Sequence, residues 1–571
     1  MGFRPPGPYR ERKGASASGA HASLAGLRPL YLAFWRANPN ALGLLAAILA
    51  VLLLRLPSFF EPPWNTDEGI FAAVAQRLIY GGDLYADAWE SKPPLFLYLY
   101  AALFKVLGAS VFSLRLAATA SALATQLTAY AIARRYFDPR RALLSSLVLG
   151  VLLGVPFWEG TLALTEIFAI LPTSLAVLSV LVWDANPRPA ARRNGLLLLA
   201  GALFGAAFLL RQTSAVVAVA VVIWLMVRDR AWVRAGLWMS AGVVLALAPV
   251  VLLFVLRGTF RWFWDANVGF FLEYIPSGAE LPFASRPAIL LPFFATVGCL
   301  LWYRRRGSTP AWGLPALWLT LTLAAAMLTG RPYSHYMLQT FPPLALLIGF
   351  CLPGLRLAWP PARAPLPVLV LVLALAIEWG YVVTPMFSGN PLAMHFTRGP
   401  TYYANFAGWA LGLRSSGDYN NYFDRRVNLT IELEKTLDNL TAEGDSVYIW
   451  GEYPWIYPLA NVKPADRYVT SFYVLLRPYL DVSFGKTLTE EDPRYIVLLL
   501  DARPTIANSS PVIDRRYRNA TKGLDEVLTR RYQRIAVVGG AHIYRRAPAP
   551  SIGGVVPSPP ETLDDFVGNV P

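Results

Sequence analysis

The sequence predicts an α-helical membrane protein that carries a smaller α/β domain toward its C-terminal end. Hydrophobic residues make up 55% of the 571 residues and charged residues only 15%, which is too apolar for a soluble protein of this size. Apolar runs of about 20 residues, the length that crosses a bilayer, recur up to residue 386. Shorter apolar runs with frequent charged and turn residues follow, and this change is typical of a folded domain outside the membrane.

Eleven membrane spans are predicted from the apolar runs and from the charges of the loops between them. The stretch 195–227 would be about 50 Å long as one helix, so we interpret it as two short spans that meet at Arg211 and Gln212. Basic residues then cluster in the loops on one side, which is the cytoplasmic side under the positive-inside rule. The other nine spans are predicted to begin near Ala41, Val111, Ala142, Leu162, Val233, Arg286, Trp312, Tyr336 and Pro367.

The same pattern predicts the domain boundaries. Residues 1–40 form a basic cytoplasmic tail, and residues 41–386 form the membrane domain, with helices along the membrane surface in the first outer loop, 61–110. Residues 387–547 form an extracytoplasmic α/β domain, and the Pro-rich segment 548–571 is a disordered tail. Buried strands are predicted at 447–450, 495–500 and 535–538, and helices at 424–440 and 521–531.

The distribution of charge and cysteine excludes two classes of function. The formal net charge is +15, but the arginines cluster in short loops between apolar runs, where they face membrane lipids. Nucleic acid is therefore not expected as a partner. The two cysteines, Cys299 and Cys351, lie inside apolar runs, so the sequence indicates no disulfide framework and no cysteine-based metal site.

Two adjacent carboxylates, Asp67 and Glu68, follow the first predicted span. Acidic residues at a membrane boundary carry chemistry, transport or a structural cap. A cap by Thr66 or Asp67 on the amphipathic helix that follows is one interpretation, and catalysis is the other. The spacing alone does not choose between the two.

The predicted topology brings more charged side chains to this outer side. Glu166, just inside a span, must be paired or face a wet cavity, and an ion pair with Arg211 is the structural alternative. Arg211 has the fork geometry that binds a phosphate, or it simply reaches for the membrane interface. The outer set comprises Asp67, Glu68, Glu90, Lys92, Glu159, Glu166, Arg211, Arg331 and His335.

Several of these residues belong to short motifs that together resemble the GT-C glycosyltransferases. The resemblance covers roughly the first 385 residues at the level of topology. It is closest to the bacterial lipid A aminoarabinose transferases and the rhizobial-type lipopolysaccharide glycosyltransferases, and more distant to the protein O-mannosyltransferases. The motifs are Asp67-Glu68, Glu90-Ser91-Lys92-Pro93-Pro94, Thr165-Glu166, Arg211-Gln212 and His335-Tyr336.

The resemblance implies a polyprenyl-phosphate sugar donor and an envelope glycan, lipid or protein acceptor on the extracytoplasmic side of the inner membrane. Displacement of a lipid phosphate with inversion needs a base for the acceptor hydroxyl and cations for the leaving phosphate. We expect Asp67 to be the base and Glu68 and Glu166 to be auxiliary acids. The substrate-binding candidates are Glu90, Lys92, Arg211, Arg331, His335 and Tyr336.

The sequence leaves alternatives for metal binding and for the function. No residue set demands a metal, although clustered outer carboxylates could hold a divalent cation. A transporter or flippase of lipid-linked saccharides is the alternative function, but such proteins usually have repeated halves, and the sequence contains no internal repeat.

Overall fold

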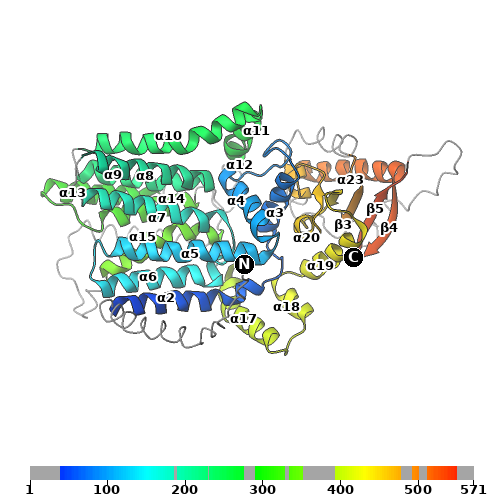
Figure 1. The fold of residues 1–571 in the computed structure, drawn as a ribbon, viewed down its shortest axis with the longest axis horizontal. Helices are drawn as coiled ribbons and strands as arrows, with labels where there is room; N and C mark the ends of the chain where they lie inside the picture. Colours follow the sequence, from blue (N-terminus) through cyan, green and yellow to red (C-terminus); the bar gives the residue numbers. More distant parts are fainter. Residues whose placement is uncertain are drawn as a thin grey trace, which may run out of the picture.

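The structure, a computed structural model, combines a long bundle of helices with a small β-sheet at one end (Figure 1). Helices α3 and α4 lie between the bundle and the sheet. The described residues are 39–185, 190–228, 231–274, 290–327, 333–351, 392–476, 492–499 and 511–548.

The bundle is built from apolar helices of very different lengths. Five of them, within the described residues, are long and apolar enough to cross a membrane: 41–60, 111–133, 165–184, 193–210 and 232–256. Eleven spans stay a prediction, and the span predicted from Pro367 lies outside the described residues. In chain order the elements are α2 (Pro39–Arg55), η1 (Leu56–Phe60), α3 (Thr66–Ile79), α4 (Pro94–Leu107), α5 (Val111–Ala133), α6 (Pro139–Gly154), η2 (Pro156–Trp158), α7 (Thr165–Asp184), α8 (Ala190–Leu210), η3 (Gln212–Ser214), α9 (Ala215–Arg228), α10 (Trp232–Leu256), α11 (Phe260–Trp264), the π-helix η4 (Asp265–Gly269), α12 (Phe270–Tyr274), α13 (Leu291–Arg305), α14 (Gly313–Met327), η6 (Ser334–Thr340) and α15 (Phe341–Cys351).

The stretch 195–227 is broken at Arg211, as the two-span interpretation expects. Helix α8 ends at Leu210, and Arg211 has an extended backbone (φ −158°, ψ 120°) before the short turn η3 leads into α9. Helix α8 packs very closely on α10, because a Cβ atom on Gly201 would lie 1.9 Å from the carbonyl oxygen of Met239. Such backbone-to-backbone contact through small residues is typical of helices within membranes.

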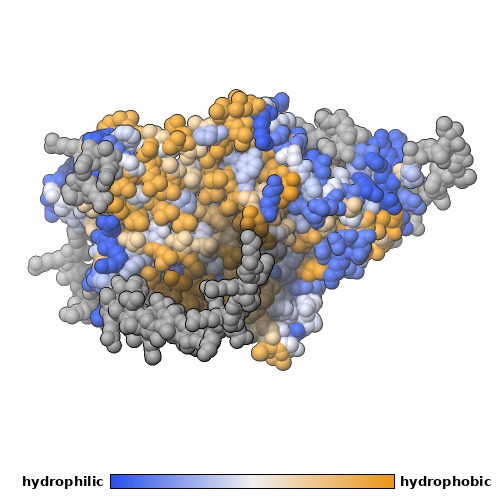
Figure 2. Space-filling view, in the orientation of Figure 1, coloured by the Kyte–Doolittle hydropathy of each residue, from blue (hydrophilic) through white to orange (hydrophobic). Residues whose placement is uncertain are grey.

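The outer surface of the bundle is apolar. Figure 2 shows hydrophobic residues across the bundle and hydrophilic residues concentrated toward the sheet. Helix α10 illustrates the pattern, since Leu237 is 68% exposed and Leu256 is 75% exposed. Large exposed apolar surfaces of this kind are lipid-facing in membrane proteins.

The C-terminal part contains a five-stranded sheet in the order β2-β1-β3-β5-β4. Strand β1 is parallel to β2 and β3, whereas β5 is antiparallel to β3 and β4. The elements are α17 (Leu392–Ala410), α18 (Ser416–Phe423), α19 (Arg426–Leu440), β1 (Ser446–Trp450), α20 (Ile456–Leu459), β2 (Lys463–Pro464), α21 (Ser471–Leu476), β3 (Tyr495–Leu499), α23 (Pro511–Arg531), β4 (Tyr532–Val538) and β5 (Ala541–Arg546).

Three details of this part differ from the sequence prediction. The strand predicted at 535–538 is not buried: β4 is an edge strand, and Val537 is 56% exposed. The helix predicted at 424–440 begins at Arg426, because Asp424 is extended and separates α18 from α19. The helix predicted from Thr521 begins ten residues earlier, at Pro511.

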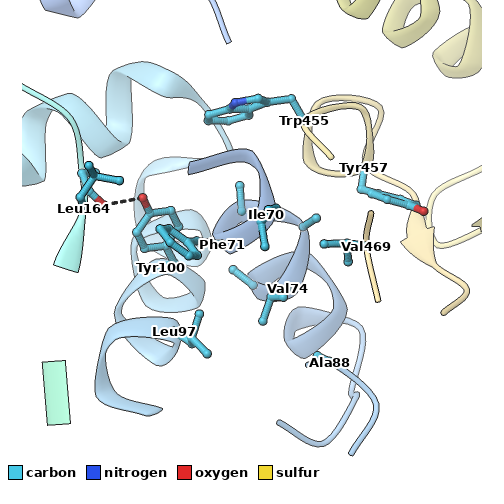
Figure 3. Close-up of a cluster of buried hydrophobic side chains, with 14 of the residues drawn as sticks. Ile70, Phe71, Val74, Ala88, Leu97, Tyr100, Leu164, Trp455, Tyr457 and Val469 are labelled. Atoms are coloured by element: carbon cyan, nitrogen blue, oxygen red, sulfur yellow. Dashed lines mark hydrogen bonds between the residues drawn. The ribbon is translucent and has the colours of Figure 1, made fainter. Parts of the chain in front are cut away.

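Helix α3 is held on both sides. Its apolar residues Ile70, Phe71 and Val74 belong to one buried cluster with α4 and with side chains of the C-terminal part (Figure 3). Trp455 contacts the start of α3 in two places. Its indole Nε1 donates to the Asn65 carbonyl oxygen over 2.8 Å. A Cβ atom on Gly69 would lie 2.7 Å from the Trp455 ring. The start of α3 is therefore fixed from outside the bundle.

Candidate active site

A cavity of about 140 Å³ opens where the bundle, α3 and the C-terminal part meet. This volume is several times the roughly 10–15 Å³ that one water molecule requires. Side chains from seven separate segments form its wall. They are Asp67, Phe71, Ser91, Lys92, Leu164, Thr165, Glu166, Arg211, Phe270, Phe271, Tyr274, Tyr333, His335, Tyr336, Phe472 and Tyr473.

Six of the nine residues expected at the site line this cavity. They are Asp67, Lys92, Glu166, Arg211, His335 and Tyr336. Glu68 and Glu90 are fully buried behind the cavity wall. Arg331 lies outside the described residues.

Asp67 lies in the first turn of α3 with an exposed side chain. The helix is capped by Asn65, whose side chain accepts from the backbone N–H of Glu68 over 2.9 Å, so the expected cap by Thr66 or Asp67 is wrong. Asn65 has the extended backbone of an N-cap residue, and this leaves the next two side chains free of that role. Within the described residues no group hydrogen-bonds the Asp67 carboxylate. Asp67 therefore faces the cavity with its oxygens available.

Glu68 points the other way, into a buried ion network. Arg115 of α5 contacts Glu68 and also donates from Nη2 to Glu61 over 2.9 Å. The same Glu68 carboxylate accepts the backbone N–H of Ala163 over 2.7 Å. Burial raises the pKa of Glu68, while Arg115 and the Ala163 N–H oppose that rise. Glu68 thus links α3 to the segment that leads into α7.

Glu166 forms the predicted ion pair with Arg211 and lines the cavity as well. Thr165 donates to Glu166 over 2.8 Å and accepts from Arg211 Nη1 over 2.9 Å. The Arg211 guanidinium lies 4.8 Å from the ring centroid of Tyr336. Since Arg211 is only 8% exposed, it is a fixed part of the wall and does not extend to the membrane interface.

His335 adds a titratable group between two acids. Its Nδ1 lies 2.6 Å from Glu159, and its Nε2 lies 3.8 Å from Glu166. Burial lowers the pKa of His335, but Glu166, Glu159 and Asp67 together raise it above the ordinary value. The imidazole is therefore more easily protonated than a free histidine.

Lys92 is the second cation of the cavity, placed just before the Pro93 N-cap of α4. Its Nζ lies 4.0 Å from Glu90 and 5.6 Å from the ring centroid of Phe71. Burial lowers the pKa of Lys92, but Glu90, Asp67 and other acidic groups raise it by more. Lys92 is therefore charged at the wall of the cavity.

Sequence reasoning missed the groups that support these residues. Arg115 lies within an apolar run, and an ionisable residue there was a usable signal. Tyr274, Tyr333, Phe472 and Tyr473 carried no such signal, because only the fold brings their segments to the cavity. The described residues contain no group of three or more His, Cys, Asp or Glu side chains that could hold a metal ion.

Helix α21 carries Phe472 and Tyr473 to the cavity and is fixed at its start by Glu452. The Glu452 carboxylate accepts from Ser471 Oγ over 2.6 Å and from the Phe472 N–H over 2.7 Å. Burial raises the pKa of Glu452 to about 7, although these hydrogen bonds oppose the shift. The loop after β1 therefore contains a carboxyl group that titrates near neutral pH.

Comparisons with known proteins identify relatives of this chain in sequence and in fold. Residues 91–254 match the family model of dolichyl-phosphate-mannose-protein mannosyltransferase. The undecaprenyl phosphate-α-4-amino-4-deoxy-L-arabinose arabinosyl transferase of Pseudomonas aeruginosa UCBPP-PA14 is 28% identical over 334 residues, 53% of this chain and 59% of that protein. The corresponding protein of Pseudomonas paraeruginosa is 27% identical over 333 residues, with the same coverage. The chain thus spans about three fifths of these curated relatives.

Solved structures show the fold. The structure of ArnT from Cupriavidus metallidurans bound to undecaprenyl phosphate has a TM-score of 0.54 and 17% sequence identity, covering 89% of this chain and 98% of that one. Its apo state has a TM-score of 0.53 and 18% identity, covering 88% and 98%.

Together the matches show that this chain is similar in sequence to the arabinosyl transferases and shares the fold of ArnT. Its apolar helices agree with a multi-pass membrane protein. The flippase alternative gains no support from any of the matches.

The buried ion pairs of Arg115 predict that replacing this residue strongly destabilises the folded protein. Replacing Arg115 by Met leaves Glu61 and Glu68 buried without their cation, which costs about 3–5 kcal/mol of the free energy of unfolding. We expect a clearly lowered melting temperature in detergent. Adding Glu61→Gln and Glu68→Gln to R115M removes the unpaired charges and should recover part of the loss. Equal instability of the single and triple variants would contradict this explanation.

Glu452 predicts a pH dependence of stability. The pKa of Glu452 is raised from 4.5 to about 7 in the folded protein, so this group lowers the free energy of unfolding as pH rises from about 4.5 to about 7 and has no further effect at higher pH. The variant E452Q stays neutral and keeps an oxygen for the Phe472 N–H. We expect the melting temperature of E452Q, relative to the natural protein, to rise between pH 5 and pH 7 and to level off above pH 7. A difference that does not change with pH would show that Glu452 does not titrate in this range.

Proposed function

We propose that this protein transfers a sugar from a polyprenyl-phosphate donor to an envelope glycan, lipid or protein acceptor on the extracytoplasmic side of the membrane. The observation that carries the proposal is the shared cavity of Asp67, Lys92 and Arg211. These residues supply one available carboxylate and two cations, and they come from three distant segments. The similarity to arabinosyl transferases that use an undecaprenyl-phosphate donor supports the same assignment.

The chemistry assigns opposite tasks to the carboxylate and the cations. The Asp67 carboxylate accepts the proton of an acceptor hydroxyl as the hydroxyl oxygen attacks the anomeric carbon of the donor. The bond between that carbon and the phosphate oxygen breaks, and its electrons leave with the lipid phosphate. Attack from the face opposite the phosphate inverts the anomeric centre. Lys92 and Arg211 stabilise the charge that develops on the leaving phosphate.

The two cations are suited to this task in different ways. Arg211 is held by Glu166, Thr165 and the Tyr336 ring, so its guanidinium is already oriented before substrate binds. Within the described residues, the ion-pair partner of the Lys92 ammonium is Glu90 at 4.0 Å, which is too far for a hydrogen bond. When it is protonated, His335 adds positive charge at the same wall. Glu68 acts in this scheme as a positioning residue for Asp67, because its own oxygens are occupied by Arg115 and Ala163.

The remaining expectations complete the proposal. The sheet-containing part, 387–547, is an extracytoplasmic domain, and the N-terminal tail 1–40 is cytoplasmic. In this proposal the chain has eleven spans, and the cavity faces the outer side of the membrane. The cavity lies at the sheet end of the bundle, beyond the apolar surface of the helices (Figure 2). A divalent cation is not required by this scheme.

The decisive variant is Asp67→Asn, which keeps the shape of the side chain and removes the base. We expect sugar transfer to fall at least a hundredfold, the lower range for loss of a general base. Affinity for undecaprenyl phosphate should change less than threefold, because the cations remain. Transfer is followed as release of undecaprenyl phosphate from a panel of undecaprenyl-phosphate sugars in membranes that contain the natural acceptors.

Asp83→Asn is the matched control. Asp83 lies in the same first loop, pairs with Arg257 over 3.0 Å and does not line the cavity. This variant should retain full transfer. Normal transfer by D67N would refute the assignment of Asp67, and loss of undecaprenyl phosphate binding by D67N would argue against its role as a base.

A further inference from the structure

Tyr473 connects the C-terminal part of the chain, through Glu90, to Lys92, one of the cations that line the cavity. Helix α21 brings its side chain to the cavity wall, where it is 9% exposed and packs edge-on against Trp89 with a centroid distance of 5.0 Å. Its hydroxyl lies 3.0 Å and 3.2 Å from the two carboxylate oxygens of Glu90 and donates to that carboxylate. Glu90 and Tyr473 are 383 residues apart, so only the folded protein makes this contact.

The Glu90 carboxylate accepts hydrogen bonds from three donors other than Lys92. In addition to the Tyr473 hydroxyl, it accepts the Ser91 backbone N–H over 2.8 Å and the Ser91 hydroxyl over 2.9 Å. Glu90 itself has no exposed surface. The carboxylate is therefore fixed in one position, 4.0 Å from the Lys92 ammonium.

This separation has a chemical consequence for Lys92. At 4.0 Å the negative charge of Glu90 still favours the protonated amine, because Coulomb attraction falls only slowly with distance in a buried site. A hydrogen bond between the two groups would need a separation of about 3 Å. The ammonium therefore keeps its charge and its N–H donors for another anion. Its side chain remains 28% exposed at the cavity.

We propose that Tyr473 is a positioning residue for the donor phosphate: it holds Glu90 away from Lys92 so that the ammonium stays charged but uncommitted. The inference rests on the proposed function, since it takes the lipid phosphate as the anion that Lys92 binds. It assigns part of the donor site to the sheet-containing C-terminal part. Without the Tyr473 hydroxyl, Glu90 is free to turn toward Lys92 and compete with the phosphate.

The test uses the full-length protein in nanodiscs and undecaprenyl phosphate as the probe. We expect Tyr473→Phe to raise the Kd for undecaprenyl phosphate about fivefold to tenfold, the range expected for one lost hydrogen bond. Tyr468→Phe is the matched control, because Tyr468 also packs on Trp89, at a centroid distance of 5.6 Å, and makes no contact with the Glu90 carboxylate. This control should bind with an unchanged Kd, and an equal loss in Y468F would overturn the proposal.

A double variant separates positioning from simple packing. In the E90Q background position 90 carries no carboxylate that could turn toward Lys92, so adding Y473F should change the Kd less than twofold. A packing defect would weaken binding equally in both backgrounds, and that result would overturn the proposal. If Y473F does not fold, S91A serves instead, since it removes a hydrogen bond on the same carboxylate and should weaken binding about twofold to threefold. An unchanged Kd in S91A would then overturn the proposal.

Binding of undecaprenyl phosphate by the natural protein distinguishes failure of the proposed function from failure of the role proposed for Tyr473. If the natural protein does not bind undecaprenyl phosphate, the proposed function fails and the role of Tyr473 fails with it. If the natural protein binds and Y473F binds equally well, only the role of Tyr473 fails.

Discussion

The buried ion network of Glu61, Glu68 and Arg115 is the constraint on which the site depends. Arg115 lies in an apolar helix, where a lone guanidinium is costly, and the two carboxylates that pair with it come from the first outer segment. Because Glu68 is also bonded to the Ala163 backbone, the network fixes the start of α3 against the segment before α7. Asp67 directly precedes Glu68, and Glu166 lies three residues after Ala163. The buried ion network therefore sets the distance between Asp67, the available base, and the cavity wall that holds Arg211.

Each basic residue of the cavity wall is paired with an acidic residue. Arg211 pairs with Glu166, His335 with Glu159 and Lys92 with Glu90, so each basic group has an acidic partner before an anion binds. Within the part of the chain that the structure describes, Asp67 has no comparable partner, and this residue is exposed. This asymmetry suits displacement of a phosphate, since the positive wall is organised in advance and the base remains accessible.

The sequence predicted the parts of the site that depend on local pattern and topology. Apolar run lengths and loop charges indicated the break at Arg211, and six of the expected residues share one cavity. The different roles of Asp67 and Glu68 were not predictable, because neighbours on a helix point about 100° apart and only the surrounding fold decides which one is buried. Strand β4 was expected to be buried because its residues are apolar, but sheet order made it an edge. Tyr473 reaches Glu90 across 383 residues, a contact that no local pattern encodes.

In the proposed function the cavity binds the phosphate of a lipid-linked donor between Lys92 and Arg211, with Asp67 beside it. A cryo-electron microscopy structure of the protein in nanodiscs with undecaprenyl phosphate would test this arrangement. We expect phosphate density within about 3 Å of the Lys92 ammonium and the Arg211 guanidinium, the distance of a charge-assisted hydrogen bond. Well-defined phosphate density elsewhere, with this cavity empty, would contradict it.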